Sequence, residues 1–246
     1  MTTPLNLILA RIAVYTEKYV LPVVYLSFAT SHFKELAGIL SGRLLPENSV
    51  FVDATHQLTL LLLSVVTSLL LLFARRAAVP PKQFKLILIP LVTAFFNFVY
   101  YTVPLFPKSW QAKLCPAEFQ IAFFTAGLSC IIVGPLFSLW GLLHLGRSFG
   151  VFVTLRKVVV TGPYKWVRHP MYLGWVCLFV GFALANFSWA YLLLVIVHIT
   201  LILYRANLEE TQLAMLSEEY RQYTKRTPFI FPKLRRSPGS APKAKY

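Results

Sequence analysis

The chain has 246 residues, of which 57% are hydrophobic and 13% are charged, whereas about 25% of the residues are charged in a typical soluble domain. Mean hydropathy is +0.63, and several apolar runs approach the roughly 20 residues that a helix needs to cross a bilayer. This composition excludes an ordinary soluble domain and a disordered chain. It predicts an all-α integral membrane protein.

The net charge of +15 comes from 24 Lys and Arg against 9 Asp and Glu. These basic residues punctuate the apolar runs and do not gather on one face, so nucleic acid is not the predicted partner. We interpret the excess as a topology signal and as attraction to anionic membrane lipids.

Six apolar windows are predicted as membrane spans, at residues 19–38, 57–74, 84–106, 118–144, 170–186 and 188–205. The last two are separated by so few residues that they predict a C-terminal helical hairpin. This threading places 20 of the 24 Lys and Arg on one side and Lys34, Arg43, Lys108 and Lys113 on the other. The positive-inside rule then predicts that both termini are cytoplasmic, in the endoplasmic reticulum of a eukaryote or the inner membrane of a bacterium.

Three regions follow from this reading. Residues 1–116 are predicted to form N-terminal transmembrane helices with about three spans, residues 117–232 the membrane region that carries the candidate site described below, and residues 233–246 a basic disordered tail. The three cysteines, Cys115, Cys130 and Cys177, have no paired spacing. The sequence therefore predicts neither a disulfide framework nor a metal site.

The segment between the fourth and fifth spans concentrates polar residues and glycines. Gly162 and Pro163 predict a turn, and Pro170 predicts that the fifth helix begins at or just after it. Arg168 and His169 then lie at a helix N-terminus, a place that attracts carboxylate or phosphate groups. Tyr164 and Tyr172 add aromatic faces that suit a base or a sulfonium cation. The competing interpretation is an interfacial aromatic belt with basic topology markers.

The order of residues in this segment, G-P-Y-x-x-V-R-H-P-x-Y-x-G, distinguishes the two interpretations. It resembles the membrane methyltransferase group that contains isoprenylcysteine carboxyl methyltransferase and the phospholipid N-methyltransferases. A second element after the sixth span, with Arg205, the pair Glu209 and Glu210, and a Y-x-x-Y-x-x-x-T-P run, resembles the closing element of the same family. The resemblance covers roughly Leu136 to Pro232.

The resemblance implies S-adenosylmethionine as cofactor, bound at the cytoplasmic face by a loop and a helix beside the hairpin. Carried over residue by residue, it implies cofactor contacts from Gly162, Pro163, Tyr164, Arg168, His169, Pro170, Tyr172, Leu173 and Gly174. Either Glu209 or Glu210 faces the cofactor. Leu216 and Ser217 stand where the family usually has Phe-Gly, so the sequence leaves the choice of glutamate open.

The acceptor is a lipidic or prenylated-protein substrate in the leading hypothesis, with the carboxylate of an isoprenylcysteine as its nucleophile. Such a carboxylate is already ionised at neutral pH, and Arg205, one helical turn before Glu209, is placed to orient it. An amine nucleophile would instead need a proton acceptor such as Glu209, Glu210 or His169. A phospholipid or a small thiol is the alternative acceptor. We therefore assign Arg205, Glu209 and Glu210 as candidate catalytic residues.

Two further readings remain open at this point. Membrane sterol or enone reductases, which use NADPH, resemble this group in the same hairpin region. The glutamate pair, however, suits a cationic methyl donor better than the 2′-phosphate of NADPH. A transporter or scaffold predicts several polar residues at mid-depth in the spans, and these are scarce. His198 is one such residue, and a hydrogen bond to a neighbouring helix is favoured over catalysis. The oligomeric state is left open.

Overall fold

The computed structural model describes residues 4–44, 50–75, 77, 81, 83–154 and 156–231. Every regular element within these ranges is helical, which confirms the all-α prediction for the described part of the chain. The predicted tail at 233–246 lies outside the described residues.

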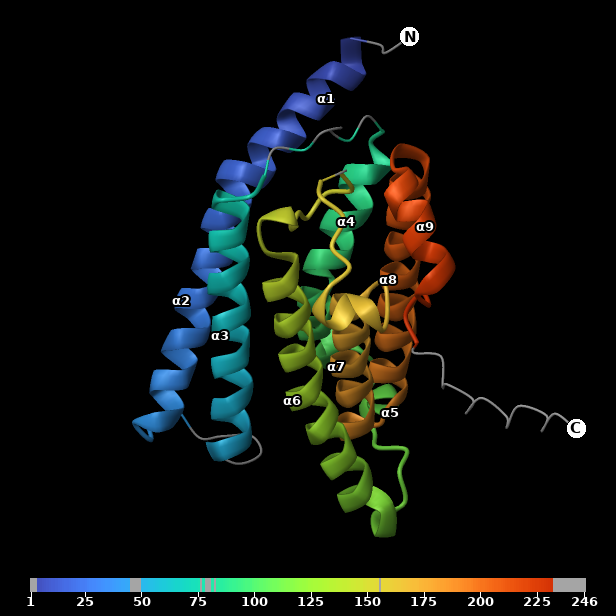
Figure 1. The fold of residues 1–246 in the computed structure, drawn as a ribbon. Coiled ribbons are helices and arrows are strands. Elements are labelled where there is room, and N and C mark those ends of the chain that lie inside the picture. The colour runs from blue at the N-terminus through green and yellow to red at the C-terminus, as the bar shows by residue number, and fades with distance from the viewer. Residues whose placement is uncertain are drawn as a thin grey trace, which may run out of the picture.

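The longer helices form two neighbouring groups that run side by side (Figure 1). The first group contains α1 (Pro4–Tyr15), α2 (Leu21–Leu40) and α3 (Val50–Leu72). The second contains α4 (Lys85–Phe95), α6 (Gln120–Leu145), α7 (Pro170–Asn186) and α8 (Trp189–Leu216). Contacts between α3 and α6 join the groups. The short α5 (Lys108–Gln111) follows α4, and α9 (Glu218–Arg226) follows α8.

Three helical segments are long and apolar enough to cross a membrane: Ala54–Leu72, Ala117–Ser148 and Trp189–Leu216. Two shorter apolar helical segments, Lys85–Tyr100 and Pro170–Asn186, coincide with two further predicted windows. The chain thus has the helices of a membrane protein, and the full count of six spans stays a prediction.

Glycines set the close packing of α6 against α7. A Cβ added to Gly134 would lie 2.6 Å from the carbonyl oxygen of Gly174, and one added to Gly127 would lie 2.8 Å from that of Gly181. Small residues at such crossings let helix backbones approach closely. This contact fixes the start of α7, which carries the residues of the predicted site.

Pro90 shapes α4. It has no N–H to donate to the carbonyl of Leu86, four residues earlier, and that carbonyl accepts a hydrogen bond from the backbone N–H of Val153 at 3.4 Å. The helix then tightens into a 3-10 segment, Phe96–Leu105, within the window predicted as one continuous span. The Leu86 carbonyl, which has no partner within α4 because of Pro90, therefore holds Val153 in the segment that follows α6.

Candidate active site

A pocket opens between the segment that follows α6, the start of α7, the C-terminal part of α8, and α9. It encloses about 870 Å³ of empty space, part of which is open to solvent. The predicted site residues that line it are Tyr164, Arg168, His169, Tyr172, Arg205 and Glu209. The fold thus brings together predicted site residues from the loop before α7, from α7 and from α8.

The start of α7 positions Arg168, His169 and Tyr172. Helix α7 begins at Pro170, as predicted, with His169 as its N-cap, because proline suits the first helical position. The preceding turn is the 3-10 segment Gly162–Lys165, in which Gly162 has a φ of +58°. The backbone N–H of Arg168 donates to the carbonyl oxygen of Pro228 at 2.9 Å, so the chain after α9 holds this turn in place.

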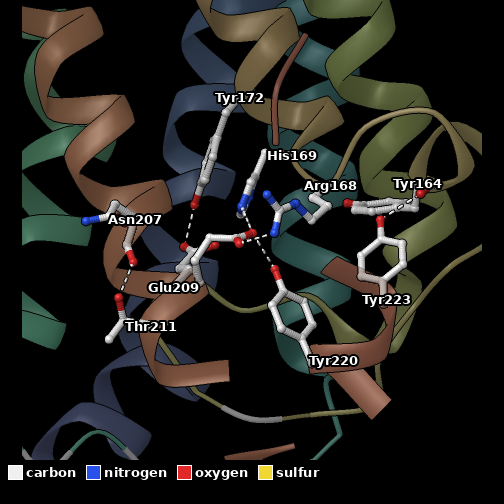
Figure 2. A network of polar contacts seen from close by, with 10 residues as sticks. Tyr164, Arg168, His169, Tyr172, Asn207, Glu209, Thr211, Tyr220 and Tyr223 are labelled. Atoms are coloured by element: carbon white, nitrogen blue, oxygen red, sulfur yellow. Dashed lines mark hydrogen bonds and ion pairs between the residues drawn. The ribbon is translucent and has the colours of Figure 1, made fainter. Parts of the chain in front are cut away.

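Glu210 is the centre of one polar cluster, and Figure 2 labels its partners Arg168, His169 and Tyr220. Its carboxylate accepts hydrogen bonds from Arg168 and, at 2.7 Å, from the hydroxyl of Tyr220, and it lies 2.9 Å from His169 Nε2. Glu210 is not among the residues that line the pocket. The chain itself therefore supplies a carboxylate to the two side chains that the sequence places at the α7 N-terminus.

One N–H group of the Arg168 guanidinium has no partner among the described residues. Arg168 Nη1 donates to Glu210, whereas its buried Nε has no hydrogen-bond partner within the described ranges. Buried polar atoms are normally paired, and Arg168 lines the pocket. This N–H is consequently suited to an anionic group of a bound molecule.

Glu209 is the centre of the second cluster and faces the pocket. The hydroxyl of Tyr172 donates to Glu209 Oε1 (Figure 2), and Arg205 Nε donates to the same oxygen at 3.2 Å. This contact confirms that Arg205 and Glu209, one turn apart, meet on one face of α8. Arg205 also donates to the carbonyl oxygens of Val151 at 2.8 Å and Pro90 at 3.4 Å.

Two tyrosines of α9, Tyr220 and Tyr223, act as donors around these clusters. The hydroxyl of Tyr223 donates to the carbonyl oxygen of Tyr164 at 2.6 Å, which ties α9 to the loop (Figure 2). Burial raises the pKa of Tyr164, Tyr220 and Tyr223 above the usual value of a phenol. All three hydroxyls therefore stay protonated at neutral pH, and those of Tyr220 and Tyr223 keep donating to Glu210 and to the Tyr164 carbonyl oxygen.

The other predicted site residues lie behind the pocket wall and do not line it. Pro163 and Pro170 are fully buried, and the Leu173 N–H donates to the carbonyl oxygen of His169 within α7. Gly174 faces α6, where an added Cβ would lie 2.2 Å from Ser138 Oγ. Their observed role is to position the lining residues.

Two side chains at this end of the molecule were missed by the sequence analysis. Glu17, on the first helix, pairs with Arg156 at 2.5 Å, and Arg156 lines the pocket. Phe229, beyond α9, packs its ring against His169 with 5.1 Å between centroids. The one signal for Glu17 in the sequence is its charge, two residues before the apolar window 19–38.

Comparison with known proteins agrees with the motifs. A model of the phospholipid methyltransferase family matches residues 122–222. A methanethiol S-methyltransferase of Pseudomonas deceptionensis is 30% identical over 150 residues, which cover 53% of this chain and 55% of the relative. A second, from Pseudomonas sp. (strain GM41(2012)), is 28% identical over 177 residues, which cover 54% of this chain and 67% of the relative.

The residues that the family model matches include the loop before α7, α7 itself, all of α8 and the start of α9. The chain spans little more than half the length of the first relative. The matched residues contain Arg168, His169 and Tyr172 together with Arg205, Glu209 and Glu210, the side chains of both polar clusters. Residues 122–222 of this chain therefore resemble the phospholipid methyltransferase family, the group of membrane methyltransferases that the R-H-P-x-Y-x-G motif predicts.

Proposed function

We propose that this protein is a membrane methyltransferase that uses S-adenosylmethionine and methylates a thiol. The observation that carries the proposal is the position of Glu209, which is the one carboxylate among the described residues that line the pocket. Both of its side-chain contacts end on Oε1. Among the described residues, Oε2 is therefore left to accept a proton from a bound acceptor.

The residues of the pocket fit S-adenosylmethionine. The carboxylate of Glu209 and the aromatic faces of Tyr164 and Tyr172 suit a cationic sulfonium, and the unpartnered Nε of Arg168 suits the carboxylate of the amino-acid part. Apolar side chains such as Val153 and Val158 line the pocket and suit the adenine ring. When bound, this cofactor supplies a methyl group for in-line transfer to a nucleophile.

The contacts of Arg205 favour an acceptor that must lose a proton. An acceptor carboxylate would need an arginine to hold it, but Arg205 already donates to Glu209, Pro90 and Val151 through Nε, Nη1 and Nη2. A thiol needs a base, since its ordinary pKa is near 8.5. Glu209 can take that proton as the new carbon–sulfur bond forms.

The names of the two relatives agree with a thiol acceptor, since both are methanethiol S-methyltransferases. Apolar helices beside the pocket suit a small or lipid-soluble thiol that arrives through the membrane. The predicted isoprenylcysteine carboxylate is the second acceptor that the test includes. Both termini are proposed to lie on the cytoplasmic side, together with the pocket.

The arginines that line the pocket give little support to a reductase that uses NADPH. Arg156 pairs with Glu17, and Arg168 pairs with Glu210. A 2′-phosphate needs several clustered guanidinium groups that are free to bind it. Arg156 and Arg168, like Arg205, each already pair with a carboxylate of the chain, and the single unpartnered Nε of Arg168 is no such cluster.

The test is calorimetric titration of the detergent-purified protein with S-adenosylhomocysteine and, separately, with NADPH. Transfer of labelled methyl groups to methanethiol, to an S-farnesylcysteine analogue and to phosphatidylethanolamine is then measured. We expect binding of S-adenosylhomocysteine alone and label on the thiol. Label on the farnesylcysteine analogue alone would reassign the acceptor, and binding of NADPH alone would replace the proposal by the reductase.

A further inference from the structure

We propose that Glu17, on the first helix and outside the region that matches the family, is a positioning residue for the active-site pocket. It holds residues 149–154 and Arg156, most of which line one wall of that pocket. The inference rests on the proposed function insofar as it names the ligand of the pocket. The contacts that carry it belong to the fold alone.

Glu17 is a buried charge with defined partners. Its side chain is 8% exposed and that of Arg156 is 6% exposed, and a charge buried to this degree requires a partner. Glu17 Oε2 accepts a hydrogen bond from Arg156 Nη2 at 2.5 Å, and Oε1 accepts one from the backbone N–H of Phe152 at 3.0 Å. The Glu17 carboxylate thus binds two groups of the pocket wall, the Arg156 guanidinium and the Phe152 N–H.

The first helix is shaped around this contact. It passes from α1 through a wider π-helical turn, Thr16–Val20, into α2, and such turns often mark functional positions. Gly150 permits the approach, because an added Cβ would lie 1.8 Å from Arg156 Nη1 and 2.8 Å from Glu17 Oε1. Apolar contacts agree, since Ala13, Leu21, Phe149 and Phe152 belong to one buried cluster.

A continuous series of contacts leads from Glu17 to the centre of the pocket. Glu17 holds the N–H of Phe152, and the carbonyl oxygen of the preceding residue, Val151, accepts a hydrogen bond from Arg205. Arg205 in turn donates to Glu209. The loss of the Glu17 carboxylate is therefore expected to move the wall and to loosen the arginine that holds Glu209.

The test compares Glu17→Gln with the wild type and with a matched control, Glu35→Gln. Glu35 lies on α2 and contacts Gln57 of α3. Its variant therefore reports any general loosening of α2 against α3. The first measurement is amide hydrogen exchange over residues 149–154, which needs no ligand. The second is the calorimetric Kd for S-adenosylhomocysteine, with the stoichiometry fitted separately.

We expect Glu17→Gln to speed exchange at Phe152 and its neighbours and to raise the Kd by about tenfold, while Glu35→Gln changes neither. A lower stoichiometry with an unchanged Kd would mean that Glu17 serves stability alone, and it would overturn the inference. Unchanged exchange would overturn it as well. If the wild type binds no S-adenosylhomocysteine while exchange still rises in Glu17→Gln, the proposed function fails and the positioning role stands.

Gly150→Ala provides a second variant in case Glu17→Gln does not fold. It leaves both charges in place and forces them apart, because its Cβ meets the guanidinium of Arg156. The same faster exchange and weaker binding are expected. Wild-type values of both in Gly150→Ala would refute a positioning role for this contact.

Discussion

Glu209 and Glu210 are consecutive residues of α8, yet their carboxylates meet different partners. Glu209 contacts Tyr172 and Arg205 and lines the pocket, whereas Glu210 contacts Arg168, His169 and Tyr220 behind its wall. Neighbouring positions on a helix differ by about 100° in direction. The sequence left open which glutamate faces the ligand, and the geometry favours Glu209.

Glu209→Gln is expected to lower kcat/KM for methyl transfer to a thiol by about 100-fold or more, because an amide does not accept the proton. The amide oxygen still accepts from Tyr172 and Arg205, so the variant should fold. Initial rates with labelled S-adenosylmethionine measure the effect. Glu219→Gln, on the exposed face of α9, is the control, and more than a tenth of wild-type activity in Glu209→Gln would remove Glu209 from the mechanism.

Glu210→Gln is expected to act first on stability. It leaves the guanidinium of Arg168, which is 15% exposed, without its carboxylate, at a cost of about 2–3 kcal/mol, near the lower end for a buried pair. Thermal unfolding in detergent should show a clear fall in Tm. An unchanged Tm combined with lost turnover would instead assign Glu210 a chemical role.

Tyr223→Phe tests the connection between α9 and the loop. The change removes the donor to the buried carbonyl oxygen of Tyr164, and an unpaired buried acceptor costs about 1–3 kcal/mol. We expect a lower Tm and weaker binding of S-adenosylhomocysteine, both measured on the purified protein. Tyr204→Phe, at a side chain that is 46% exposed, should behave as wild type, and equal effects from the two variants would argue against the connection.

The parts of the site that lie close together in sequence could be predicted. Pro170 marks the start of α7 because proline restricts its own backbone and that of the residue before it. Arg205 and Glu209 meet because residues four apart share one face of a helix. The motifs also placed Arg168 and His169 at one site with the glutamate pair, but they did not predict that Glu210 itself pairs with Arg168 and His169.

Contacts between distant parts of the chain could not be predicted in this way. Glu17 and Arg156 are far apart in sequence, and hydrophobic periodicity reports which face of a helix is apolar without naming its partner. The first predicted span begins at residue 19, yet helix already runs from Pro4 through Arg11, Glu17 and Lys18. It does so at Glu17 because Arg156 and the Phe152 N–H compensate the buried charge.

Gly174→Ala should destabilise the protein by about 1–3 kcal/mol, as overpacking of a tight contact does. Its Cβ would lie 2.5 Å from the backbone oxygen of Gly134, so α7 must move away from α6. Gly141→Ala is the matched control, because its nearest contact is 3.3 Å, to Met171. The Tm values of the two variants should differ clearly, and equal values would show that this crossing tolerates a methyl group.

His198→Phe tests whether the buried histidine of α8 serves packing or chemistry. His198 is 2% exposed, its Nε2 lies 3.3 Å from the carbonyl oxygen of Thr93, and its ring centroid is 3.9 Å from that of Phe179. Its Nδ1 has no hydrogen-bond partner within the described part of the chain. His198→Phe therefore removes an unsatisfied polar atom together with the contact to the Thr93 carbonyl oxygen, and these two changes have opposite effects on stability.

We therefore expect His198→Phe to keep a Tm close to that of the wild type and to retain methyl transfer within about twofold, since His198 does not line the pocket. Parallel assays of His169→Phe give the contrast. His169 lines the pocket and contacts Glu210, so its loss should weaken binding of S-adenosylhomocysteine. Lost turnover at a native Tm in His198→Phe would instead place a catalytic group deep in the apolar part of α8, where an ionisable side chain is costly to keep without a function.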